Sequence, residues 1–286
     1  MKKRDWFLIG GAIYLVFIVA FAAFGPAVRQ VQLYPLAKIV DPAITQFDVV
    51  REAVSKKPFQ PPGTGEAFLG TDELSRDVVA RLAQGARVSL LVGLVVQGIA
   101  LVVGVLMGVL GVFGPKWLRQ PIMRFTDGMF AFPDILLAIL IVAVVGLGIL
   151  PVIAALAVTS WPSIARLVST QVATLKDREY VVAAKAAGAP TGYLVIKHIL
   201  PQLSGLLLAY SMIELAGTIL AESTLSFLGI GVQEPDPSWG NMINTARINM
   251  NSHPVMLIWP CLFLSATIFA LNFVGDGLRA YFDPKS

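Results

Sequence analysis

Charged residues are scarce in this sequence. Only 14% of the 286 residues are Asp, Glu, Lys or Arg, while 56% are hydrophobic; a soluble domain typically carries about 25% charged residues. The composition therefore predicts a membrane protein. The net charge of +4 is not gathered into the basic stripe that nucleic-acid-binding proteins use, so we expect no nucleic-acid partner.

Cysteine and histidine are nearly absent as well. Cys261 is the one cysteine, and His198 and His253 are the two histidines. A single cysteine cannot form an internal disulfide, and these residues do not have the spacing of a zinc site. We expect no metal site in this chain.

Nucleotide-binding motifs are missing too. No glycine is followed by lysine, so there is no G-x-x-x-x-G-K-[ST] loop to hold nucleotide phosphates, and GIGVQE at 229–234 departs from G-x-G-x-x-G in its last residue. No Ser, His and Asp set has a recognisable catalytic spacing. The sequence predicts neither an enzyme nor a cofactor on this chain, and ATP-driven transport would need an ATPase elsewhere.

Long apolar runs dominate what is present. A helix of about 20 apolar residues crosses the ~30 Å hydrocarbon core of a bilayer, because each residue rises ~1.5 Å. The sequence predicts an all-α, polytopic membrane protein with six transmembrane helices. The expected spans are residues 6–24, 88–114, 129–148, 150–172, 203–228 and 254–274. The first run is longer than the apolar region of a signal peptide, so we expect it to be an uncleaved span.

Three regions follow from these spans: an N-terminal helix in 1–24, an extracytoplasmic segment in 25–87, and a core of five transmembrane helices in 88–286. Val78, Val79, Leu82 and Ala86 recur at helical spacing and predict a short surface helix within the extracytoplasmic segment.

Lysine and arginine in the short loops predict the orientation, because cytoplasmic loops carry an excess of them. The loop at 229–253 contains only one lysine or arginine, Arg247, so we expect it on the outer side. With both termini in the cytoplasm, the cytoplasmic basic residues are Lys2, Lys3, Arg4, Lys116, Arg119, Arg124, Lys176, Arg178, Lys185, Lys197, Arg279 and Lys285.

Four charged residues fall inside the expected spans. Asp134 and Arg166 would lie at similar depth on antiparallel helices, so we predict that they pair; the alternative is that Arg166 reaches the interface and Asp134 faces a wet vestibule. Glu214 falls near the middle of the fifth span and Glu222 about two turns further out. All four charged residues are candidates for the translocation pathway or its gate, and for the two glutamates the alternative is an interhelical hydrogen bond that fixes packing.

The stretch EYVVAAKAAGAPTGYLVIKHILP at 179–201 lies between two spans. Its alanines favour helix, Gly188 suits a helix end, and Pro190 suits the start of a second short helix that runs to Pro201. Alanine permits close approach to another surface, so the segment is predicted to dock against a protein. An amphipathic helix on lipid is the alternative, although it would prefer larger apolar residues.

Several stretches resemble one family. AAKAAG followed by KHILP is similar to the EAA signature of ABC importer permeases, matched here by Ala183, Ala184, Gly188 and Pro201, and the EY form with Glu179 is similar to the peptide and nickel branch. LGTDELSRDVVARLAQGARVSL, SWPSIARLV, ESTLSFLGIGVQEPDPSWGNM and GDGLRAYFDP resemble the C-type permeases of dipeptide, oligopeptide and nickel importers. Ser75 replaces the glycine usual in one of these motifs. The resemblance covers roughly residues 65–286.

The resemblance implies a permease in a prokaryotic plasma (inner) membrane, with coupling helices at 176–201. The implied partners are a homologous B-type permease, two ABC ATPases that hold ATP and Mg, an extracytoplasmic solute-binding protein and membrane lipid. ATPase coupling would fall to Glu179, Ala183, Ala184, Gly188 and Pro201.

Short peptides are the expected substrate, with nickel, metal chelates or glutathione-like solutes as alternatives. The 25–87 segment either receives the binding protein, covers the pathway or is a scaffold on the membrane. From a different class, a self-contained secondary carrier or a membrane scaffold stays open.

Overall fold

Helices make up most of the computed structural model, which describes residues 3–45, 48, 51–55, 57–63 and 67–282. Five helices are long and apolar enough to cross a bilayer, and a bent pair adds a possible sixth span. The long helices are α1 (Lys3–Val40), α2 (Val78–Phe113), α5 (Ile149–Leu175), α8 (Leu200–Phe227) and α10 (Val255–Phe282). The prediction of an all-α membrane protein is confirmed.

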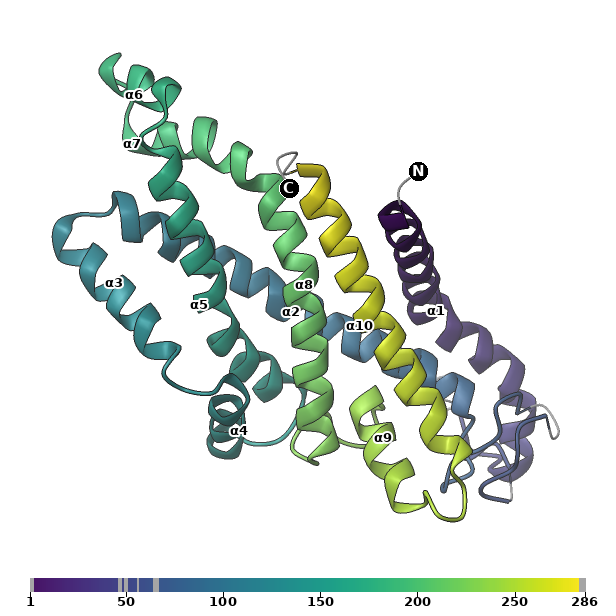
Figure 1. Ribbon diagram of the computed structural model, residues 1–286. Coiled ribbons are helices and arrows are strands. Elements are labelled where there is room, and N and C mark those ends of the chain that lie inside the picture. The colour runs from purple at the N-terminus through teal and green to yellow at the C-terminus, as the bar shows by residue number, and fades with distance from the viewer. Residues whose placement is uncertain (1–2, 46–47, 49–50, 56, 64–66, 283–286) are drawn as a thin grey trace.

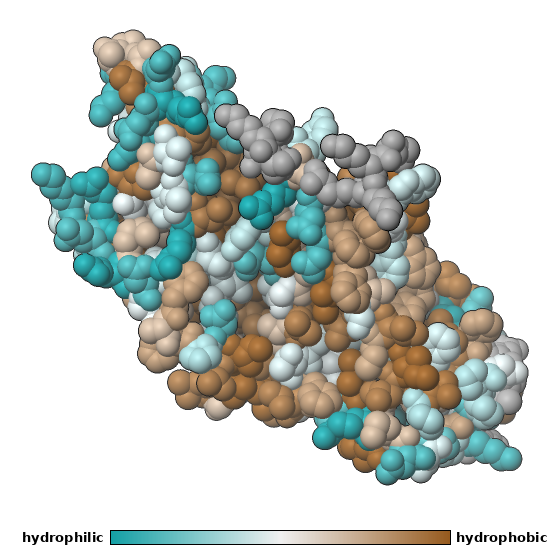
Figure 2. Space-filling model, viewed as in Figure 1, coloured by the Kyte–Doolittle hydropathy of each residue, from teal (hydrophilic) through white to brown (hydrophobic). Residues whose placement is uncertain are grey.

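The shorter helices lie between these spans. They are α3 (Lys116–Met129), α4 (Asp134–Val145), α6 (Glu179–Ala186), α7 (Thr191–Tyr193), the π-helix η1 (Leu194–Ile199) and α9 (Trp239–Ile248). Figure 1 shows α6, the start of α1 and the end of α10 toward one end of the molecule, with α9 and the segment between α1 and α2 at the other. Brown apolar surface lies between teal areas at the two ends in Figure 2, as expected for a chain in a bilayer.

Small residues on α2 set its close packing against α5. A Cβ added to Gly104 would lie 2.6 Å from the Cβ of Ile164, and one added to Gly108 would lie 2.7 Å from the Cβ of Val168. Glycine is favoured at such crossings because it lets helix backbones approach.

Two helix boundaries differ from expectation. α1 continues through Pro26 to Val40 instead of ending near residue 24. α2 begins at Val78 instead of residue 88, so the predicted separate surface helix at 78–86 is wrong. Its apolar residues are the buried first turns of α2, with Leu82 fully buried. Asp77 caps this start, its Oδ1 accepting from the Ala80 amide at 2.7 Å.

The expected straight span at 129–148 is also wrong. The chain leaves helix at Phe130–Pro133, and α3 and α4 meet there at an angle of 93°. Proline disfavours helical geometry in the residue before it, here Phe132, which accounts for a break at this position. α4 has only 12 residues, about 18 Å of helix, so it is too short to cross the hydrocarbon alone.

The predicted stop at Pro201 is wrong as well. Helical structure runs without interruption from Thr191 to Phe227, and Pro201 occupies the first turn of α8. Proline cannot donate the usual helical hydrogen bond, and its ring crowds the preceding turn. The wider π turn of η1 directly before it provides the room, as π-helical insertions do.

Candidate functional site

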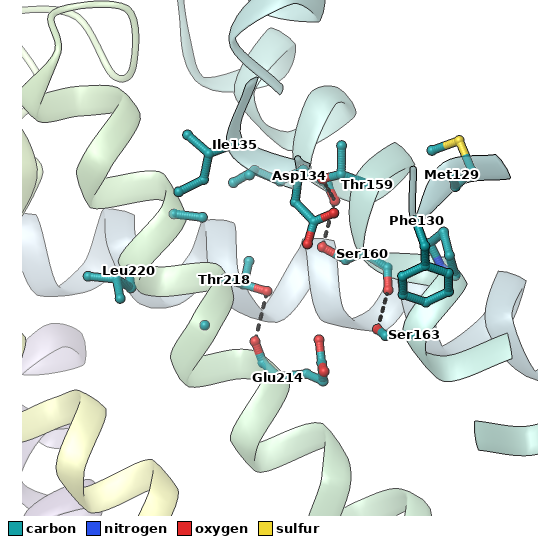
Figure 3. A pocket seen from close by; sticks show the side chains of 14 residues that line it. Met129, Phe130, Asp134, Ile135, Thr159, Ser160, Ser163, Glu214, Thr218 and Leu220 are labelled. Atoms are coloured by element: carbon teal, nitrogen blue, oxygen red, sulfur yellow. Dashed lines mark hydrogen bonds between the residues drawn. The ribbon is translucent and has the colours of Figure 1, made fainter. Parts of the chain in front are cut away.

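A cavity of about 280 Å³ lies among α3, α4, α5 and α8. Figure 3 shows Asp134 and Glu214 from two sides of it, with the hydroxyls of Ser160, Ser163 and Thr218 nearby. No lysine or arginine is among its lining residues. The structure therefore brings together two of the four in-membrane charges that the sequence singled out.

The polar groups of this cavity mostly offer acceptors. Ser160, Ser163 and Thr218 donate their hydroxyl hydrogens to main-chain carbonyl oxygens of their own helices, at 2.7, 2.9 and 3.0 Å. Each hydroxyl oxygen keeps lone pairs available, and an ionised carboxylate is only an acceptor. Glu214 also interacts with Tyr210 and Ser163. The arrangement suits a ligand that is rich in N–H donors.

The predicted ion pair between Asp134 and Arg166 is wrong. Arg166 pairs with Asp127 of α3, and its guanidinium also lies 4.2 Å from the centre of the Phe130 ring. The cause is the bend after α3, which brings Asp127, and not Asp134, to Arg166. Asp134 lies in the first turn of α4, where a negative charge is favourable at a helix N-terminus.

Glu222 lies outside the cavity and is fully buried. Its carboxylate accepts from Ser89 of α2 at 2.9 Å and from Ser226 at 2.8 Å. The Ser226 hydroxyl oxygen in turn accepts from the Val232 amide at 3.1 Å. These contacts match the packing interpretation of Glu222, joining α2, α8 and the loop before α9.

α6 ends in a tight motif built around Gly188. The Gly188 amide donates to Lys185 at 3.0 Å and the Ala189 amide donates to Ala184 at 3.1 Å, which is the Schellman pattern. Gly188 has φ +87°, a conformation that glycine adopts without steric cost. The expected turn after the alanine-rich helix is present, and Pro190 begins the next helix as its N-cap.

One face of α6 is buried against the rest of the protein, and the other face is exposed. Val181 is buried in an apolar cluster with Val172 of α5 and Ile199 of η1. Glu179, Ala183 and Gly188 are exposed, and Ala184 is partly buried against the cluster. An anchored helix thus presents a small-residue surface with no described segment over it.

Sequence reasoning missed an ionic cluster at the α9 end of the molecule. Arg76 donates to Asp72 and to Glu234, both at 2.7 Å, and Arg81 donates to Glu234 at 2.8 Å. Both arginine side chains are only 3% exposed. The cluster ties the start of α2 to the loop before α9, across more than 150 residues of sequence. The only hint in the sequence is that acids and an arginine alternate in TDELSRD and that QEPD supplies two further acids.

The charge on Glu234 is predicted to make stability pH-dependent. Burial acts to raise its pKa, but Arg81 and Arg76 outweigh burial and hold the pKa below its ordinary value of 4.5. A lowered folded-state pKa gives stabilisation that is complete above the unfolded value and is lost as pH falls through the folded value. The melting temperature of Glu234→Gln should lie below wild type by a constant margin from about pH 7 to pH 5, and the margin should shrink below about 4.5. A margin that persists in acid would contradict this assignment.

Ser75 has φ +62°, a left-handed conformation that glycine adopts without steric cost. A side chain in this left-handed region costs about 1–2 kcal/mol, partly offset by the extra freedom that glycine gains when unfolded. Ser75→Gly is predicted to raise the unfolding free energy by about 0.5–1 kcal/mol, read as a higher melting temperature. The control is Ser238→Gly, because Ser238 has φ −125° and caps α9; that change should lower it. An unchanged or lower value for Ser75→Gly would show that the turn is not strained.

Known proteins are similar to this chain over most of its length. The family described as binding-protein-dependent transport system inner membrane component matches residues 100–286. The oligopeptide transport system permease protein OppC of Haemophilus influenzae is 39% identical over 77% of this chain and 71% of its own length. The di/tripeptide transport system permease protein DppC of Pseudomonas aeruginosa is 37% identical over 97% of this chain and 88% of its own length. The glutathione transport system permease protein GsiD of Pectobacterium atrosepticum is 40% identical over 76% of this chain and 72% of its own length.

The fold agrees with a solved transporter. Inward-facing MetNI, a methionine ABC transporter, superposes with a TM-score of 0.59 over 71% of this chain and 96% of that chain, at 20% identity. That likeness speaks for the fold alone, and the sequence relatives carry the family assignment. The resemblance found in the sequence motifs is confirmed: this chain belongs to the family of binding-protein-dependent transport system inner membrane components, the permease subunits of ABC importers.

Proposed function

We propose that this chain is a permease subunit of an ATP-driven, binding-protein-dependent importer of short peptides. The observation that carries the proposal is the exposed small-residue surface of α6, which Val181 anchors at one end of the molecule. The sequence contains no nucleotide-binding loop of its own. Energy from ATP then has to enter through contact with another protein. The sequence relationship to oligopeptide and di/tripeptide permeases supports this role.

The helical path from α6 to the cavity offers a mechanism. After the turn at Gly188, one uninterrupted helix runs from Thr191 to Phe227 and carries Glu214 and Thr218 into the cavity wall. When an ATPase moves α6, this helix transmits the displacement to the cavity. Access then alternates between the two sides of the membrane if the ATPase contact favours one arrangement of the helices over the other.

The residues of the coupling segment take separate roles. Ala183 allows close approach on the exposed side, and Ala184 helps to seat α6 on its own protein. Glu179, in the first turn of α6, favours the helix through its dipole. Gly188 sets the turn, and Pro201 lies in the first turn of α8, directly after the π turn η1. Contact with the ATPase falls to Ala183 and its exposed neighbours.

The orientation and partners follow from this role. The α6 end and both termini face the cytoplasm, in agreement with the basic loops at that end. Two ATPase subunits hold ATP and Mg there, and a homologous B-type permease completes the pathway beside the cavity. A solute-binding protein delivers substrate to the α9 end, where the 25–87 region and the loop before α9 are joined by the ionic cluster.

The chemistry of the cavity fits a peptide. Asp134, Glu214 and the lining hydroxyls offer acceptors to the ammonium terminus and the amide N–H groups of a peptide. Weak contacts of this kind allow passage of varied side chains, so the binding protein would select the substrate. A glutathione-type substrate is the second candidate, supported by the 40% identity to a glutathione permease.

The test is uptake by the purified transporter in proteoliposomes with its binding protein outside. Labelled di- and tripeptides, glutathione and nickel are offered outside, with ATP or a non-hydrolysable ATP analogue enclosed in the liposomes, or with an imposed proton gradient alone. We expect peptide uptake that requires ATP hydrolysis. Uptake driven by the gradient alone would identify a secondary carrier, and ATP-dependent uptake of only glutathione or nickel would overturn the peptide assignment.

A further inference from the structure

A second, larger cavity opens at the α6 end of the molecule. It has a volume of about 960 Å³ and lies among α5, η1 and the adjoining ends of α8 and α10. It shares no lining residue with the cavity that contains Asp134 and Glu214. In Figure 1, the helical segment that includes η1 crosses from α6 toward the upper end of α8 in this region.

The described residues give this cavity charge of one sign. Arg178, Lys197 and Arg279 line it together with the imidazole of His198, and none of the described residues that line it is acidic. Within the described part of the chain, no carboxylate oxygen lies within 4.0 Å of the charged nitrogens of these three cations. By contrast, the Arg76 and Arg81 side chains at the opposite end both pair with carboxylates.

Three separate elements supply these groups. Arg178 precedes α6, Lys197 and His198 belong to η1, and Arg279 lies in the last turn of α10. The π turn η1, which lies directly before α8, thus carries two of these four groups. His198 is further positioned by Tyr180 and Tyr193, whose ring centres lie 6.3 and 5.6 Å from its own.

Part of the remaining wall is apolar. Leu167, Leu203, Leu206 and Phe282 form this part, and Gln171, Gln202 and Ser204 add uncharged polar groups to the lining. Phe282 lies directly over Gly205, where an added Cβ would be only 2.4 Å from the ring. The cavity thus combines donors and positive charge with an apolar wall where the helices reach the membrane surface.

We propose that this cavity binds the phosphate group of an acidic phospholipid from the cytoplasmic leaflet. Arg and Lys pair with phosphate oxygens through charge-assisted hydrogen bonds, and basic pockets between transmembrane helices on the cytoplasmic side suit acidic headgroups. The apolar wall accommodates the start of an acyl chain, which a soluble phosphate compound does not have. The cytoplasmic assignment rests on the orientation given under the proposed function.

Such a lipid would lie beside Arg178, at the start of α6. Its phosphate would join Arg178, next to α6, to Lys197 of η1 and Arg279 of α10. These groups would otherwise repel one another, so the lipid would hold the base of α6 against α8 and α10 in the membrane.

The test compares lipid retention by purified transporter complexes. Protein is exchanged into nanodiscs of phosphatidylcholine with a small share of phosphatidylglycerol, re-extracted in mild detergent, and its bound lipids are counted by native mass spectrometry. The test variant is Lys197→Gln with Arg279→Gln. The matched control is Lys116→Gln with Arg124→Gln, which removes one lysine and one arginine at the same membrane end but outside this cavity.

We expect wild type and the control to retain phosphatidylglycerol over phosphatidylcholine, and the test variant to lose this preference by about tenfold or more. Lys197→Gln alone, for use if the double variant fails to assemble, should lose part of it. Equal loss in control and test variants, or no preference in wild type, would overturn the site. Displacement of the lipid by millimolar inorganic phosphate would assign the site to a soluble phosphate and overturn the lipid source. Retention is read without transport, so it fails or succeeds independently of the peptide import assay.

Discussion

Ala183→Arg is expected to reduce ATP-driven peptide uptake about 100-fold or to background. Ala183 is exposed on α6, and arginine there would hold an ATPase away or place an unpaired charge in the contact. Leaving one charge buried and unpaired costs about 3 kcal/mol or more, which corresponds to a loss of about 100-fold in the population of the docked state. Uptake in proteoliposomes at matched protein amounts measures the effect.

The control for this change is Ala183→Ser, which keeps the residue small and uncharged and should retain most of the uptake. Both variants should insert and melt like wild type, because the side chain at 183 points away from the Val181 cluster. Normal uptake by Ala183→Arg would contradict the docking role of α6. Equal loss in both variants would show that position 183 acts through folding and not through contact.

Gly217→Phe is expected to lower peptide uptake by about tenfold or more while ATP hydrolysis continues. Gly217 lines the cavity of Asp134 and Glu214, and an added Cβ there meets nothing within 4 Å. A phenyl ring can therefore fill the cavity without displacing a helix. Even a loss of about 1.4 kcal/mol in substrate occupancy corresponds to tenfold.

Gly98→Phe is the matched control for the cavity. Gly98 is an exposed residue of α2, an added Cβ there also meets nothing within 4 Å, and it does not line the cavity. Uptake should be nearly unchanged in this variant. Full uptake by Gly217→Phe, or equal losses in both, would place the pathway elsewhere.

The membrane spans could be predicted from sequence because they depend on local apolar runs. The same reasoning placed the start of α2 ten residues late, since Arg81 and Arg87 interrupt the run. Arg81 is accommodated through Glu234, which lies 153 residues further along the chain. No local pattern contains that contact.

In the candidate site, too, local features could be predicted from the sequence and contacts between distant residues could not. The alanines, Gly188 and Pro190 predicted the helix and turn of the α6 segment, because capping is decided within a few residues. The pairing of Arg166 could not be obtained this way. It depends on the bend between α3 and α4, which brings in Asp127, and on a distance between helices that the sequence does not specify. The cavity and the basic pocket likewise depend on how separate helices meet.

Site-specific cross-linking tests the central claim, that α6 receives the energy of ATP from a partner, most directly. In a Cys261→Ser background, a single cysteine is placed at Ala183 of α6 or at Ile248 of α9, which is exposed at the opposite end. The transporter is cross-linked in its native membrane, and the products are identified by mass spectrometry. The cysteine at 183 should cross-link to an ATP-hydrolysing subunit, in a yield that changes with ATP, and the cysteine at 248 should not. An ATPase joined to position 248, or none joined to 183 in transporter that imports peptide, would contradict the account.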